Sequence, residues 1–71
     1  MRAGEVENLH NFLLQKDLDR IFDYRVLSRA AGLTYGDPEV LLKLNSILEE
    51  LKCRGHISWY IAVGNNYWIR G

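Results

Sequence analysis

The amino-acid sequence predicts a small α+β fold in which three helices are followed by a β-hairpin. Two observations support this prediction. Up to Arg54, apolar residues recur at helical spacing, which is the pattern of helices that pack one face on a core. From His56 to Arg70 the apolar period changes to alternation, in segments rich in β-branched and aromatic residues. Such segments favour strands.

Composition indicates one globular domain. Of the 71 residues, 48% are hydrophobic and 25% are charged, which is typical of folded proteins. We expect a single domain over residues 5–71, preceded by a frayed tail over residues 1–4. The formal charge is zero and there is one cysteine. The single cysteine excludes an internal disulfide and favours a reducing, cytoplasmic setting. No apolar run approaches the roughly 20 residues that cross a bilayer, so no membrane partner is expected.

The clearest element lies between Asp37 and Gly55. Asp37 is a good N-cap, and Pro38 suits the first helical position. Gly55 supplies the left-handed residue that ends many helices. We therefore predict a third helix over about residues 37–54. Its apolar stripe consists of Val40, Leu41, Leu44, Ile47, Leu48 and Leu51.

A first helix is predicted over about residues 5–16. Its inner face is marked by Val6, Leu9 and Leu13. Phe12 and Leu14 flank this face. They either cover the edges of the core or form part of a homodimer interface.

A second helix, YRVLSRAA, is predicted between Asp23 as N-cap and Gly32 as its stop. Arg25 and Arg29 lie one turn apart on its outer face. Just before it, residues 21–22 form a short extended segment that is a candidate extra strand.

The hairpin is predicted with a three-residue loop, Gly64 to Asn66, which would pair Val63 with Tyr67 and Ile61 with Ile69. This register puts the more aliphatic face on the core, namely Ile57, Trp59, Ile61, Val63, Tyr67 and Ile69. The other face then carries Ser58, Tyr60, Ala62, Trp68 and Arg70. Tyr60, Trp68 and Arg70 are either covered by a neighbouring segment or form an aromatic patch of the kind found at protein interfaces.

Three helices followed by a hairpin, with a glycine closing the third helix, resemble a winged helix-turn-helix domain. The residues that carry the resemblance are DYRVLSRAAGLT for the second helix and turn, VLLKLNSILEELKCRGHI for the third helix and its exit, and ISWYIAVGNNYWIR for the wing. The apolar spacing common in that family is matched by Leu44, Leu48, Leu51, Gly55 and Ile57. The resemblance covers nearly the whole chain from Glu5, and its motifs are patterns of apolarity rather than catalytic signatures.

The resemblance implies a dimeric transcriptional regulator that binds double-stranded DNA. The third helix would present its N-terminal half to the major groove of the DNA. The second helix would cross the DNA sugar-phosphate backbone, and the hairpin would serve as the wing. The DNA-binding residues implied by position are Arg25, Arg29, Tyr35, Glu39, Lys43, Asn45, Ser46, Asn65, Asn66 and Arg70.

Local charge supports an alternative. Between Leu33 and Arg54, the cations Lys43, Lys52 and Arg54 stand against Asp37, Glu39, Glu49 and Glu50, and the wing loop has no cation. Affinity for DNA grows with the number of phosphates neutralised. Either a homodimer doubles the contacts, or the fold is a protein–protein assembly module without a nucleic-acid partner. Interface candidates are Phe12, Leu14, Tyr60 and Trp68.

No enzyme activity, cofactor or metal site is expected. Cys53 and His56 form a C-x-x-H pair, but a structural zinc site needs four ligands and only His10 remains. The same scarcity argues against a Cys–His nucleophilic pair. No glycine-rich phosphate loop is present.

Overall fold

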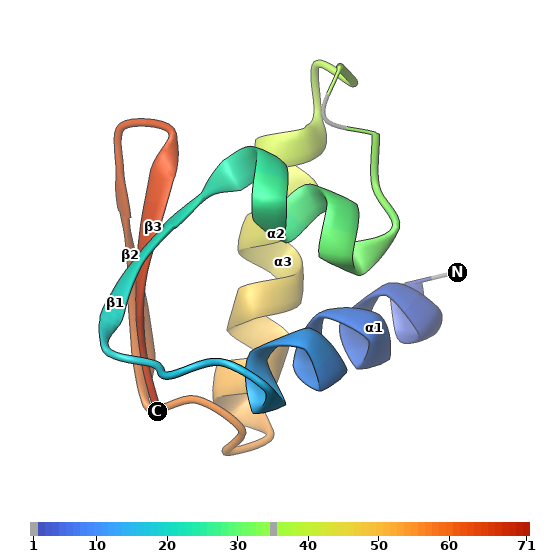
Figure 1. Cartoon of the computed structure of the whole chain (residues 1–71). Helices are drawn as coiled ribbons and strands as arrows, with labels where there is room; N and C mark the ends of the chain where they lie inside the picture. The colour runs from blue at the N-terminus through green and yellow to red at the C-terminus, as the bar shows by residue number, and fades with distance from the viewer. Residues whose placement is uncertain (1, 35) are drawn as a thin grey trace.

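A computed structural model of the chain describes residues 2–34 and 36–71, with the side chains described from Gly4. Three helices lie on one face of a three-stranded antiparallel sheet (Figure 1). The elements are α1 (Arg2–Leu14), β1 (Arg20–Asp23), α2 (Tyr24–Ala31), α3 (Val40–Cys53), β2 (Trp59–Val63) and β3 (Asn66–Arg70). The predicted α+β class is confirmed. The extended segment before α2 is a strand, so the sheet has three strands instead of the two in the predicted hairpin.

The first two helices have nearly the predicted bounds. Helix α1 begins at Arg2, within the segment expected to be a tail. Helix α2 is capped as predicted, because the Asp23 carboxylate accepts a hydrogen bond from the Arg25 N–H at 2.8 Å. It stops at Gly32, which has a φ of 85°, and the Leu33 N–H donates back to the Ser28 carbonyl. This pattern is a Schellman motif.

Helix α3 begins later than predicted, at Val40 and not near Asp37. Asp37 caps a turn that precedes the helix, since its carboxylate accepts from the Glu39 N–H at 2.9 Å. Its carbonyl accepts from the Val40 N–H. The capping chemistry was therefore predicted correctly, but residues 37–39 form this turn rather than the first turn of the helix.

The C-terminal end of α3 is as predicted. Gly55 has a φ of 81°. Its N–H donates to the Lys52 carbonyl, and the His56 N–H donates to the Leu51 carbonyl at 2.9 Å. These two bonds satisfy carbonyls that the helix itself leaves unpaired.

The predicted hairpin register is wrong by one residue. Val63 pairs with Asn66 and Ile61 with Trp68, so the loop contains two residues, Gly64 and Asn65. Gly64 has a φ of 64°, whereas Asn65 does not have a positive φ. Glycine at the first central position is the requirement of a type II′ turn, whose twist matches that of the flanking strands.

This shift exchanges the faces of β2. Trp59, Ile61 and Val63 point away from the helices, whereas Tyr60 points toward them. Ile57 is buried, but it lies before β2 and out of phase with that strand. Assigning Ile57 and Trp59 to one continuous strand caused the error, because a one-residue slip moves every side chain to the opposite face.

The core lies between the inner face of the sheet and the three helices. Helix α3 supplies most of its centre, with Leu44, Ile47, Leu48 and Leu51 fully buried. From the sheet come Phe22, Tyr67 and Ile69, and from the other helices Val6, Leu9, Leu13, Leu27 and Ala31. The central strand β3 thus contributes Tyr67 and Ile69 inward, as predicted, and Trp68 outward.

Candidate interaction surfaces

The outer face of the sheet carries three rows of side chains across its three strands. The strand pairings place Ile21, Trp68 and Ile61 in the middle row. Asp23, Asn66 and Val63 form the row beside the β2–β3 turn (Gly64-Asn65), and Asp19, Arg70 and Trp59 form the row at the other end. The five large apolar residues of this group are between 37% and 52% exposed. We call these nine residues the outer sheet face.

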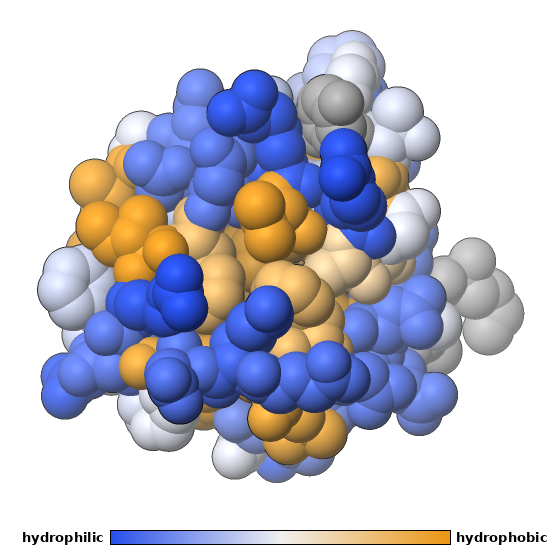
Figure 2. Space-filling view, in the orientation of Figure 1, coloured by the Kyte–Doolittle hydropathy of each residue, from blue (hydrophilic) through white to orange (hydrophobic). Residues whose placement is uncertain are grey.

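Hydrophobic atoms gather over the sheet at the left of the molecule in Figure 2. Ile21, Ile61 and Val63 are more exposed than the two tryptophans, which are partly covered by their neighbours. Other hydrophobic groups are visible at the centre and at the lower edge of this view, between hydrophilic side chains. Large apolar side chains grouped in this way on a surface are typical of interaction sites.

Asp19 contacts two residues at the end of the outer sheet face that lies away from the β2–β3 turn. Its carboxylate accepts a hydrogen bond from the Trp68 indole N–H at 3.1 Å and pairs with the Arg70 guanidinium at 3.1 Å. The guanidinium lies over the Trp59 ring, 5.5 Å from its centroid. These contacts hold both tryptophans and Arg70 in defined orientations on the surface. Asp19 has a φ of 68°, a conformation that aspartate tolerates better than most residues.

Tyr60 does not belong to the outer sheet face, which corrects the prediction. Its hydroxyl donates to the Glu49 carboxylate at 3.0 Å and lies 3.3 Å from the Asn45 carbonyl. Burial, followed by the hydrogen bond to Glu49, raises the pKa of Tyr60 to about 12. Tyr60 therefore links β2 to α3 through its hydroxyl. The other predicted interface residues differ from one another: Trp68 is on the outer sheet face, Phe12 packs against Phe22, and Leu14 is exposed on α1.

Several of the implied DNA-binding residues lie at one end of the molecule. The β2–β3 turn, the start of α2 and the start of α3 are all at the top of Figure 1. The Asn65 carbonyl accepts from the Tyr24 N–H at 3.0 Å, which links the β2–β3 turn to α2. Arg25 and Asn66 are thereby brought near each other, whereas Arg70 lies at the opposite end of β3. Tyr35 lies outside the described residues.

The cations at this end are paired with carboxylates. Lys43 Nζ lies 2.8 Å from the Asp37 carboxylate, and Arg25 lies 3.2 Å from Asp23. The hydrogen bond from Lys43 lowers the pKa of Asp37 and raises that of Lys43. The hydrogen bond from Arg25 lowers the pKa of Asp23 in the same way. These pairs leave the electrostatic attraction for phosphate small.

The exposed surface of α3 is mixed and not basic. Leu42 is 69% exposed and Glu39 is exposed beside the start of the helix, whereas Asn45 and Ser46 are half-buried. Farther along, Lys52 pairs with Glu49 and Arg54 with Glu50. Each cation of α3 and its C-cap is thus neutralised by a carboxylate close in sequence.

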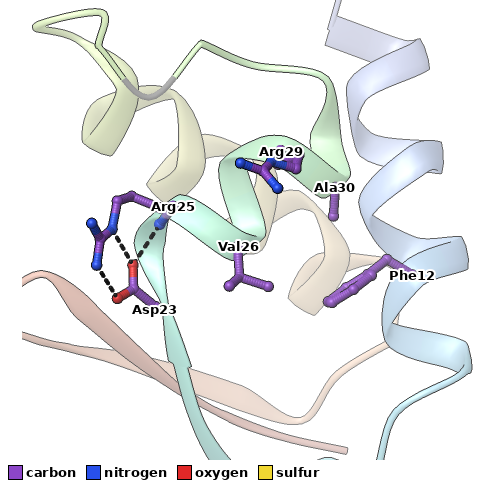
Figure 3. A pocket seen from close by; sticks show the side chains of 6 residues that line it. All are labelled: Phe12, Asp23, Arg25, Val26, Arg29 and Ala30. Carbon is purple, nitrogen blue, oxygen red and sulfur yellow. Dashed lines mark hydrogen bonds and ion pairs between the residues drawn. The ribbon is translucent and has the colours of Figure 1, made fainter.

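A hollow of about 500 Å³ lies between α1 and α2. Figure 3 shows Val26 and Phe12 directed toward it, with Ala30 beside them and Arg25 turned toward Asp23. Arg29 makes no ion pair among residues 2–34 and 36–71. The hollow thus has an apolar floor of Phe12, Val26 and Ala30, and its rim carries Arg29 and the Arg25–Asp23 pair.

His10 and His56 are stacked, with ring centroids 3.8 Å apart. The structure thus brings together two of the three residues considered for zinc. Within the described part of the chain, no group of three or more His, Cys, Asp or Glu residues is arranged to hold a metal ion. No helix in that same part is both long and apolar enough to span a membrane.

Comparison with known proteins adds no relative, since no family model, curated protein or solved structure matches the chain. The sequence predicted the order of elements and the position of Trp68 and Arg70. It missed the apolar outer sheet face. The signal that could have found it is the dipeptide Gly64-Asn65, which favours a two-residue hairpin turn and the observed register.

Proposed function

We propose that this chain is a protein-interaction domain of winged-helix architecture, and that the outer sheet face is its binding surface. The architecture is supported by the element order α1-β1-α2-α3-β2-β3 together with the strand order β1-β3-β2. The function rests on one observation, which is the group of five half-exposed apolar side chains on the sheet.

The composition of the outer sheet face fits this role. Trp68 lies in the middle row of the central strand, with Ile21 and Ile61 on either side. Tryptophan and arginine are enriched among residues that dominate binding energy, and Trp59, Trp68 and Arg70 supply them here. Contacts with Asp19 already fix Trp68 and Arg70, and the Arg70 guanidinium in turn lies over the Trp59 ring. Because they are ordered before binding, less side-chain entropy is lost on association.

Photo-crosslinking tests this proposal. We expect p-benzoylphenylalanine at position 61 to capture a protein when the chain is expressed in its source cells and irradiated. The same amino acid at position 14 is the matched control, because Leu14 is also exposed but lies on α1. Adducts at both positions with equal yield, or at neither, would contradict a binding surface on the sheet.

A second candidate function is binding to double-stranded DNA. It is favoured because the β2–β3 turn, the start of α2 and the start of α3 lie at the same end of the molecule. Arg25 and Lys43 are exposed or half-buried, and exposed ion pairs contribute little stability. Phosphate can therefore replace their carboxylate partners. Because the neighbouring carboxylates of Asp23, Asp37 and Glu39 oppose phosphate, this function predicts weak binding that becomes weaker still as the salt concentration rises.

A salt titration with random-sequence duplex tests DNA binding. The expected result is affinity that falls as salt rises, and a smaller salt slope for Lys43→Ala, by about one phosphate contact. Lys52→Ala is the matched control, since Lys52 is also paired with a carboxylate but lies at the other end of α3. Absence of binding at low salt would exclude this function.

A further inference from the structure

We infer that the partner seated on the outer sheet face is a second copy of this chain, packed face to face about a two-fold axis. This inference rests on the proposed function, because it names the partner for the same surface. Three features of the molecule support it: the size of the apolar area, the placement of charge around it, and the absence of net charge on the chain.

The apolar area fits a dimer interface of ordinary size. Five side chains that are 37–52% exposed present on the order of 400–500 Å² of apolar surface. A standard interface buries roughly 800 Å² on each partner, including a polar rim. The nine residues of the outer sheet face therefore supply most of the required contact area, and neighbouring polar residues supply the rest.

The two carboxylates of the outer sheet face lie on one side of it. Asp19 and Asp23 are on the β1 side, whereas the β2 side carries only Trp59, Ile61 and Val63. A two-fold axis parallel to the strands, between β2 and β3, would place Trp68 of each copy against Ile61 of the other. The carboxylates would then lie at the rim and stay hydrated, as in interfaces with an apolar centre and a polar edge.

The charge of the chain permits two copies to approach. Its nine cationic and nine acidic residues give a formal net charge of zero, so there is no long-range repulsion to keep the copies apart. Within the outer sheet face, Arg70 is neutralised by Asp19. The second copy of the chain therefore meets no unpaired charge at the centre of the interface.

Sedimentation equilibrium over a concentration series tests this inference. The expected mass is twice the 8.3 kDa of one chain at high concentration. The tryptophan emission maximum should move to shorter wavelength over the same range, because Trp59 and Trp68 leave water. Ile61→Asp should raise the dissociation constant at least roughly tenfold, since the symmetric interface then buries two charges.

Leu42→Asp is the matched control, because Leu42 is exposed on α3 and lies off the sheet. Its dissociation constant should equal that of the wild type, and circular dichroism should show both variants folded. A dimer broken by Leu42→Asp but not by Ile61→Asp would overturn the inferred interface. If the wild type stays monomeric while position 61 crosslinks to a protein of another mass in source cells, the second-copy inference is wrong and the proposed function stands. If position 61 crosslinks to no protein, both are wrong.

Discussion

At the scale of single residues, Tyr60 shows how one hydroxyl joins the sheet to α3. It bridges to Glu49 and the Asn45 carbonyl, two groups one helical turn apart on α3. The alternation of side chains along Trp59, Tyr60 and Ile61 does not show whether Tyr60 is exposed or packs against a helix. The distinction depends on the hairpin register, which a single residue at the turn determines.

We predict that Tyr60→Phe destabilises the fold by about 1 kcal/mol at neutral pH, because the hydrogen bond from the half-buried Tyr60 hydroxyl to the Glu49 carboxylate is lost. Urea unfolding monitored by circular dichroism measures this change. Tyr24→Phe is the matched control, since no hydrogen bond of the Tyr24 hydroxyl is found among the described residues. Equal stability of Tyr60→Phe and the wild type would show that the hydroxyl adds nothing to stability.

The raised pKa of Tyr60 also predicts alkaline behaviour. The folded-state pKa of about 12 exceeds the ordinary value of 10.0, so the folded chain holds the proton more tightly than the unfolded chain. The stability from this group is therefore fully present below pH 10 and is lost as the pH rises toward 12. Tyr60→Phe should lose less stability over that interval, measured as the difference in unfolding free energy between pH 9 and pH 11.

At the scale of elements, the sequence predicted what local chemistry determines. Asp23, Gly32 and Gly55 end or begin helices through bonds to their own neighbours, and all three were assigned correctly. Asp37 has the right local bonds, but the helix itself starts three residues later. The outer sheet face was missed because it depends on register and on the burial of Ile57 outside the strand. Neither can be read from alternation alone.

Replacing Gly4 in α1 and Gly55 after α3 by alanine should change the stability in opposite directions. Gly55→Ala should destabilise the fold by roughly 1 kcal/mol, because its φ of 81° strains an L-residue although the added Cβ meets no atom within 4 Å. Gly4→Ala should stabilise by up to about 1 kcal/mol, since Gly4 lies in α1 with equally open space. Thermal melts of both variants measure the effects, and the same sign for both would contradict this explanation.

At the scale of the whole molecule, the small core makes each buried residue important. A chain of this size is expected to be stable by roughly 4–10 kcal/mol. Helix α3 supplies four fully buried side chains to the middle of the core. Because α3 packs against α1, α2 and β2, we expect the loss of one of these side chains to weaken the whole core rather than one contact.

We predict that Leu48→Ala costs about 2–5 kcal/mol, as expected for a cavity in a packed core. This is enough to leave much of the chain unfolded at moderate temperature. Leu42→Ala is the matched control on the same helix and should change the stability by less than about 0.5 kcal/mol, because Leu42 is exposed. Similar denaturation midpoints for the two variants would argue that α3 packs by another face.

The strand order has a consequence for how the chain folds during synthesis. Strand β3 lies between β1 and β2, yet it is the last of the three to be made. Until β3 has left the ribosome, β1 has no neighbour to pair with, and Phe22 lacks the Tyr67 that lies beside it in the finished sheet. The three-stranded sheet can therefore form, and the core can close, only after residues 66–70 have emerged from the ribosome.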